Sequence, residues 1–149
     1  MACPFFWPVR KSEEGGWLHA SRLPLGCGWT GHCSAPGYEG TKPSDEEVRE
    51  LCNLGYATNC PRLPAGRACD AVRFSVARER GAQLSLRFVC EAGHRPVEHG
   101  TLEYDSQLGR WISSHADARI QKMAECYLET YLLRRTQPAG AGFPASTNL

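Results

Sequence analysis

Apolar and polar residues alternate between residues 70 and 112, which is the pattern of β-strands with one buried face. The apolar runs are short and are separated by turn signals, such as Gly81 and the sequence DSQLG before a final short strand, RWI. Four strands on short connections predict an antiparallel meander with one face covered by another part of the chain. The residues expected on that face are Val72, Phe74, Val76, Leu84, Leu86, Phe88, Cys90, Leu102 and Tyr104.

The pattern changes to a helical period in residues 115 to 135. Apolar residues recur there every three or four positions, which predicts an amphipathic helix. Ser114 and Asp117 suit its start, and Arg134 and Arg135 suit the negative end of the helix dipole. We expect this helix to cover the apolar face of the meander. Its predicted stripe consists of Ile120, Met123, Ala124, Tyr127, Leu128, Tyr131 and Leu132.

Residues 1 to 69 carry one comparable signal. Ser44 is followed three residues later by Glu47, which is the capping-box pattern at a helix N-terminus. Asn53 and Gly55 then favour termination. The pattern predicts a short helix with Cys52 on its inward face, near its C-terminal end, and loops elsewhere in this half.

These elements together predict an α+β fold. A loop-dominated half rich in Cys, Gly and Pro, with one short helix, would precede a four-stranded antiparallel meander packed by a long C-terminal helix. We expect a single domain over 1–135, made of a cysteine-rich half (1–69) and the meander with its helix (70–135). Residues 136–149 lack periodicity and are expected to form a flexible tail.

Composition and charge narrow the possible functions. The chain has 149 residues, of which 42% are hydrophobic and 22% charged, as in globular proteins. Its formal net charge is +1 and its basic residues are dispersed, so neither a nucleic-acid groove nor a membrane-surface patch is expected. The N-terminus resembles neither a signal peptide nor a membrane span, because Pro4 and Pro8 interrupt its apolar residues. We therefore expect a cytoplasmic protein with reduced thiols.

The cysteines are the main candidates for chemistry. In a reducing compartment, a group of cysteines favours metal binding or redox chemistry over structural disulfides. No two of them have the Cys-x2-Cys spacing of a zinc ribbon, so spacing alone is a weak signal. Inert buried thiols and functional disulfides stay open as alternatives. Six cysteines lie in the first 69 residues: Cys3, Cys27, Cys33, Cys52, Cys60 and Cys69.

Four of these six are predicted ligands: Cys3, Cys33, Cys52 and Cys60. Cys3 and Cys60 are each followed by proline, as is the last cysteine of a bacterial ferredoxin run. Cys52 is held at a helix end close in sequence to Cys60, and Cys33 is slightly preferred to Cys27. Cys69 is held in reserve, because it leads directly into the first strand.

The predicted cofactor is a [4Fe–4S] cluster, with zinc as the alternative. A cluster needs thiolates, shielding from water and backbone N–H groups directed at sulfur, and glycine- and aromatic-rich loops can supply that surrounding. The sequence leaves open an electron-transfer, sensing or architectural role, and whether the protein is an enzyme. A metal-free interaction module that binds a protein partner is the competing class, and a thiol enzyme is a third.

The remaining candidates are weaker. Cys90 is expected to be a core thiol, and Cys126 to lie at the edge of the long helix. His94 and His99 are expected to be exposed in the link between two strands. His32 adjoins Cys33 and would be a ligand only in a zinc or mixed site.

Overall fold

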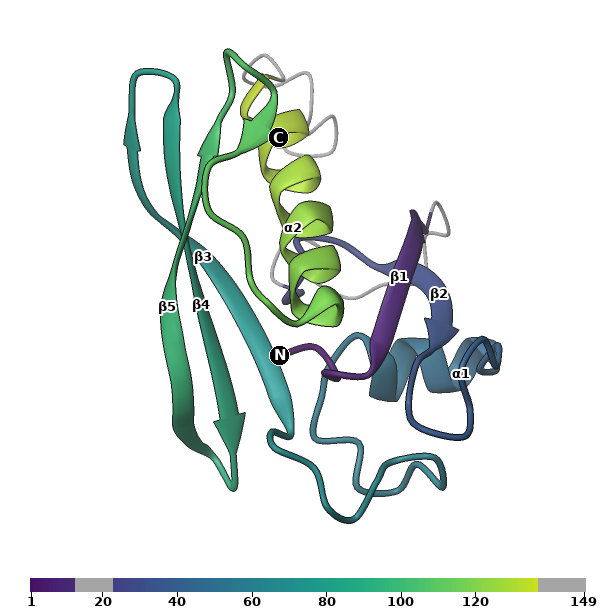
Figure 1. The fold of residues 1–149 in the computed structure, drawn as a ribbon. Helices are drawn as coiled ribbons and strands as arrows, with labels where there is room; N and C mark the ends of the chain where they lie inside the picture. The colour runs from purple at the N-terminus through teal and green to yellow at the C-terminus, as the bar shows by residue number, and fades with distance from the viewer. Residues whose placement is uncertain (13–22, 137–149) are drawn as a thin grey trace, which may run out of the picture.

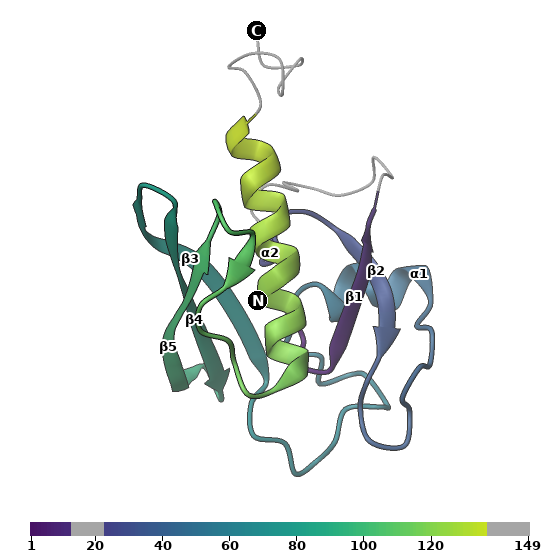
Figure 2. The same ribbon diagram turned by 45° about the horizontal axis from the view of Figure 1, so that its top comes forward.

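The computed structural model describes residues 1–12 and 23–136. Helix α2 (Ala118–Thr136) lies between two antiparallel sheets, one on each side (Figures 1 and 2). The larger sheet comes from the second half of the chain and the smaller one from the first half. Among the described residues, no helix has both the length and the apolar character required to cross a membrane. The predicted tail falls almost entirely outside the described residues.

The larger sheet confirms the predicted meander. Its strands are β3 (Ala71–Arg80), β4 (Gln83–Ala92), β5 (Arg95–Asp105) and β6 (Arg110–Trp111), in that spatial order. Strand β5 begins earlier than the sequence analysis expected. Gly93 and His94 form a two-residue turn in which both φ angles are positive, at 59° and 66°. His99 therefore lies in a strand and not in a link.

Helix α2 confirms the predicted long helix but buries more of its circumference than expected. It begins at Ala118, and the Asp117 carboxylate accepts a hydrogen bond from the Arg119 amide at 2.9 Å. Cys126 was expected at the helix edge, and that expectation was wrong: its exposed fraction is 3%. The reason is the second sheet, which packs against the side of α2 opposite the meander (Figure 1).

That second sheet is a hairpin that the sequence analysis did not predict. It pairs β1 (Phe6–Lys11) with β2 (Trp29–Cys33) in antiparallel register. Pro8 and Gly31 obscured the strand pattern, because both residues usually weaken a strand. Here they lie opposite each other, and a side chain at Gly31 would collide with the backbone of Trp7. The close approach of the two strands therefore requires glycine.

The two halves of the chain share one apolar core. Phe6 and Trp29 from the hairpin belong to the same buried cluster as Leu86 and Met123 from the second half. The N-terminus is also attached to the meander, because Ala2 exchanges two backbone hydrogen bonds with Val72, at 2.7 and 2.8 Å. The residues just after Ala2 are thus fixed next to the start of β3.

The predicted short helix is present, with a wider final turn. Helix α1 (Asp45–Glu47) continues directly as the π-helix η2 (Val48–Cys52). Its capping box is confirmed: the Glu47 amide donates to Ser44 Oγ at 3.1 Å, and the Ser44 amide donates to Glu47 Oε1 at 2.9 Å. The element ends at Cys52, as predicted.

Asn53 joins this helix end to β2. Its side chain is fully buried, and its Oδ1 accepts a hydrogen bond from the Trp29 amide at 3.1 Å. Its Nδ2 donates to the carbonyls of Trp29 and Val48, at 3.0 and 2.8 Å. Because Cys52 precedes Asn53 and Cys33 ends β2, this network fixes the two elements that carry those cysteines.

Candidate metal centre

Four thiols face one small cavity in the N-terminal half. They belong to Cys3, Cys33, Cys52 and Cys60, the four predicted ligands. The cavity measures about 20 Å³. Its other walls are formed by the apolar side chains of Phe5, Phe6, Pro43, Leu51 and Ala57. The charged side chain of Arg62 completes the lining. The structure thus brings these cysteines together from four separate segments, while their role as ligands stays a prediction.

The two Cys-Pro steps make the same backbone hydrogen bond. In residues 3–6 the Phe6 amide donates to the Cys3 carbonyl at 3.0 Å, and in residues 60–63 the Leu63 amide donates to the Cys60 carbonyl at 3.2 Å. Each cysteine is thus the first residue of a β-turn with proline second, where the fixed φ of proline is favoured. Both turns present their cysteine to the same cavity.

Further backbone contacts hold the segments in register. The Cys3 amide donates to the Cys52 carbonyl at 3.0 Å, which joins the N-terminal segment to the end of η2. Gly55 makes this approach possible: its φ is +76°, and a Cβ there would lie 2.5 Å from the Met1 carbonyl oxygen. The Cys60 amide donates to the Ala57 carbonyl at 2.9 Å.

Backbone amides also point at two of the sulfurs. The amides of Phe5 and Phe6 donate toward the Cys3 sulfur. The Ala35 amide donates to Cys33 Sγ at 3.3 Å. Hydrogen bonds of this kind stabilise negative charge on sulfur, and they surround thiolate ligands in metal sites.

The site disfavours thiolates unless a positive charge compensates them. Burial is the largest cause that raises the pKa of Cys3 to about 11, and burial likewise raises the pKa of Cys52 to about 12. Repulsion from neighbouring cysteines, including Cys33 and Cys60, adds to both increases. A bound cation would reverse this effect, because a thiolate is the form that coordinates metal.

Arg62 is the positive side chain on the cavity wall. One of its terminal nitrogens lies 2.9 Å from the Glu47 carboxylate. Its Nε is buried and has no hydrogen-bond acceptor among the described residues. A buried donor without an acceptor is costly, and a bound anionic group beside it would supply the missing partner.

The donor set therefore fits a thiolate-bound metal, while the spacing does not form a closed tetrahedron around one ion. Within residues 1–12 and 23–136, no three His, Cys, Asp or Glu side chains form a group that could hold a metal ion as they stand. Four thiolates around a cubane have sulfurs roughly 6–7 Å apart, against roughly 3.5–4 Å around zinc. The cavity has room for one small ion, and a cubane would require the cavity to widen.

The other cysteines lie elsewhere. Cys27 Sγ is 3.7 Å from Thr130 Oγ1 on α2, and Cys126 faces the Pro8 carbonyl. Cys69 contacts Cys90, which is a buried core thiol as expected, with 2% of its area exposed. Neither Cys27 nor Cys69 lines the cavity of the four thiols.

The histidines considered as possible ligands do not line this cavity either. His32 stacks on Trp7 across the hairpin, with ring centroids 6.3 Å apart. His94 is exposed in its turn but stacks on Tyr56, with centroids 4.2 Å apart. His99 is exposed on β5. We therefore assign no ligand role to these side chains.

A larger cavity, of about 590 Å³, lies beside the first one. Phe5 contributes to the walls of both. The sequence analysis missed this cavity, because its walls come from distant segments that no local pattern connects. Its polar and thiol-bearing walls are Arg67, Cys69, Cys90, Glu98, His115, Asp117 and Arg119.

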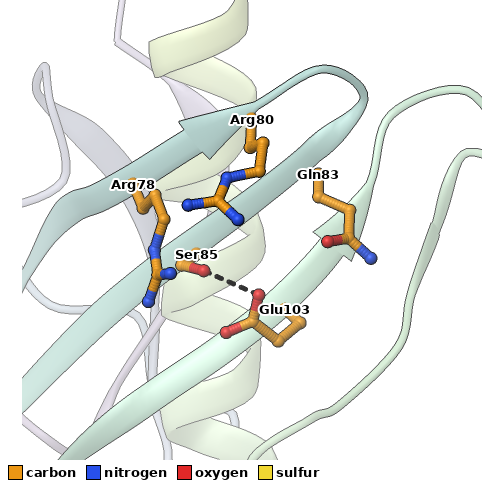
Figure 3. Close-up of a pocket in the computed structure, with 5 residues that line it drawn as sticks. All are labelled: Arg78, Arg80, Gln83, Ser85 and Glu103. Atoms are coloured by element: carbon orange, nitrogen blue, oxygen red, sulfur yellow. Dashed lines mark hydrogen bonds between the residues drawn. The ribbon is translucent and has the colours of Figure 1, made fainter.

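A third, polar depression of about 140 Å³ lies on the meander (Figure 3). Arg78 and Arg80 extend over it from β3, and the Ser85 hydroxyl donates to Glu103 Oε1 at 2.7 Å. The arginines are exposed. The carboxylate on its wall, that of Glu103, is already bonded to the Ser85 hydroxyl, and no cysteine lines the depression, so it is a weaker candidate than the thiol sites.

Comparisons with protein-family models, with curated proteins and with solved structures find no match to this chain.

Proposed function

We propose that this protein binds one [4Fe–4S] cluster through Cys3, Cys33, Cys52 and Cys60. The observation that carries the proposal is the pair of matching Cys-Pro turns that face one thiol-lined cavity. The cluster would supply one-electron redox chemistry or a structural cross-link. The cytoplasm is the proposed compartment, since its reducing conditions keep all four thiols available.

The protein's own groups favour an anionic centre at this position. Amides directed at the sulfurs of Cys3 and Cys33 stabilise thiolate charge. A [4Fe–4S]²⁺ core with four thiolates carries a net charge of about −2, which the Arg62 guanidinium would partly offset. The aromatic side chains of Phe5 and Phe6 would limit the access of water.

Zinc is the second candidate, and the size of the cavity favours it. A cavity of about 20 Å³ has the size for one ion, although the thiols would have to rearrange to coordinate it. Four thiolates around one zinc form a structural site without redox chemistry. A metal-free interaction module is the third reading.

The test is anaerobic purification followed by metal and sulfide analysis. A cluster predicts brown protein with broad absorption near about 400 nm and about four iron and four sulfide per chain. Ser in place of any one of the four cysteines should abolish most of this absorption. Cys27→Ser and Cys126→Ser are matched controls, because they remove thiols outside the cavity and should keep the colour.

The alternative outcomes are distinct. Colourless protein with one zinc per chain, lost in the same four variants, would replace the cluster by a structural zinc site. Colourless, metal-free protein that stays folded after all four substitutions would contradict both metal assignments. In cluster-loaded protein, reversible bleaching by dithionite would identify a redox role, whereas an unfolding transition on cluster removal would identify an architectural one.

A further inference from the structure

The larger cavity contains a second arrangement of thiols that the metal proposal does not use. Cys69 and Cys90 both line this cavity, although only 8% and 2% of their areas are exposed. Their access to small molecules is therefore through the cavity. A volume of about 590 Å³ lies in the range of small-molecule sites.

The two thiols interact with each other at the wall of this cavity. The Cys90 thiol donates a hydrogen bond to the Cys69 sulfur, which also receives the Ala71 amide. The bond from Cys90 is the largest cause that lowers the pKa of Cys69, and the same bond raises the pKa of Cys90. Cys69 is also the more exposed of the two thiols, so it is the one assigned to meet the substrate first.

The backbone holds one partner firmly and the other at the end of a loop. Cys90 lies within β4, paired with Val72 of β3. Cys69 precedes β3 and lies outside the hydrogen-bonded part of that strand. The amide of the next residue, Asp70, donates a hydrogen bond to the Glu91 carbonyl at 2.6 Å. This arrangement fixes the backbone on either side of the pair and leaves Cys69 at the more adaptable position.

We propose that Cys69 and Cys90 form a redox-active dithiol that reduces a low-molecular-weight disulfide bound in this cavity. The Cys69 thiolate attacks one sulfur of the substrate, RSSR, forming Cys69–S–S–R and releasing RS⁻. The Cys90 thiol then loses its proton, and its thiolate attacks the Cys69 sulfur and displaces the second RS⁻. Two electrons pass to the substrate, the protein gains one disulfide, and two protons accompany the two thiols produced.

The charged side chains around the dithiol fit a substrate that carries both charges. Arg119 lies against the ring of Phe5, with its guanidinium carbon 4.9 Å from the ring centroid. His115 Nε2 lies 2.8 Å from the Glu98 carboxylate on the same wall. Oxidised glutathione has carboxylates and ammonium groups, so it serves as the probe for this class.

The test exposes anaerobically purified, fully reduced protein to oxidised glutathione and maps the cysteines by mass spectrometry. We expect an intact mass lower by about 2 Da and a peptide pair linked through Cys69 and Cys90. In Cys90→Ser the reaction should stop at a Cys69 adduct with one glutathionyl group. Cys69→Ser should form neither product, and Cys126→Ser, which removes a buried thiol elsewhere, should behave like the wild type.

Two results would overturn the proposal. One is wild-type protein in which Cys69 and Cys90 both remain free thiols after exposure. The other is a Cys90→Ser variant that is folded by circular dichroism and acquires no adduct at Cys69. Neither readout depends on metal content, which is measured on the same samples. Failure of the metal proposal and failure of the dithiol proposal can therefore be told apart.

Discussion

In residues 71–136 the buried side chains come from strands and a helix whose hydrophobic periodicity indicates which face is buried. In residues 1–70 the buried side chains come mostly from loops and from a hairpin interrupted by Pro8. Leu84 and Leu86 are each 1% exposed on a regular strand. Phe6 and Trp29 are buried almost as completely, at 1% and 2%, within the core cluster that they share with side chains of the second region. The second region supplies the core against which the first one folds.

The same contrast separates the two thiol sites. The four-thiol cavity is built entirely from the first region, where turns and backbone hydrogen bonds position each cysteine. The Cys69–Cys90 cavity lies where the regions meet, with walls from both. A change in the core of the second region should therefore affect both sites, while a change in the connections of the first should affect the four-thiol cavity more.

The largest expected effect follows from truncating Met123. This side chain is fully buried on α2 in the core shared by both regions. Met123→Ala should lower the free energy of unfolding by about 2–5 kcal/mol, through lost burial and the cavity left behind. Urea denaturation followed by circular dichroism measures it. Leu133→Ala is the control on the same helix, because Leu133 is 46% exposed, and an equal loss there would show that α2 is not packed as described.

A smaller effect, confined to the first region, is expected for Asn53→Ala. The variant leaves the Trp29 amide without its acceptor in a buried position. We expect a loss of about 1–3 kcal/mol and weaker metal retention, because Cys33 and Cys52 lose their common anchor. Metal content after dialysis and urea denaturation test this. Asn59→Ala, at an exposed position, should change neither the stability nor the metal content. Unchanged metal retention in Asn53→Ala would show that the hydrogen bonds of Asn53 do not position the four-thiol cavity.

The capping box should contribute less. Ser44→Ala removes the acceptor for the Glu47 amide at the exposed start of α1. The expected cost is about 0.5–2 kcal/mol, since a helix cap is lost but no buried group is uncovered. Thermal denaturation compares it with Thr58→Ala, an exposed hydroxyl outside the helix. Equal melting temperatures for Ser44→Ala and the wild type would contradict a stabilising role for the cap.

The smallest effect at neutral pH concerns the thiols themselves. The folded-state pKa values of Cys3 and Cys52 are raised to about 11 and about 12 from a usual 9.0. Their neutral forms therefore stabilise metal-free protein fully below about pH 9, and this stability is lost as pH rises toward 11–12. Urea denaturation of metal-free protein between pH 7 and 11 should show the decline, and Cys52→Ala should make it shallower. An identical slope in that variant would mean that Cys52 titrates as in the unfolded chain.

Local patterns were sufficient for most of the architecture. Alternation identified the strands of the meander, the three-and-four spacing around Met123 identified α2, and Ser44 with Glu47 identified the start of α1. Each of these signals is a property of neighbouring residues and does not depend on how distant segments pack. The choice of Cys3 and Cys60 likewise rested on a local feature, the proline after each, and the structure shows both in β-turns.

Tertiary structure decided what depends on two distant segments. The burial of Cys126 requires the β1–β2 hairpin on the far side of α2, and the hairpin itself depends on Gly31 lying opposite Pro8. The contact of Cys69 with Cys90 requires the start of β3 to lie beside β4. A sequence records which side chain occupies each position, but the distance between two sulfurs is set by how separate elements pack, and no local period encodes it.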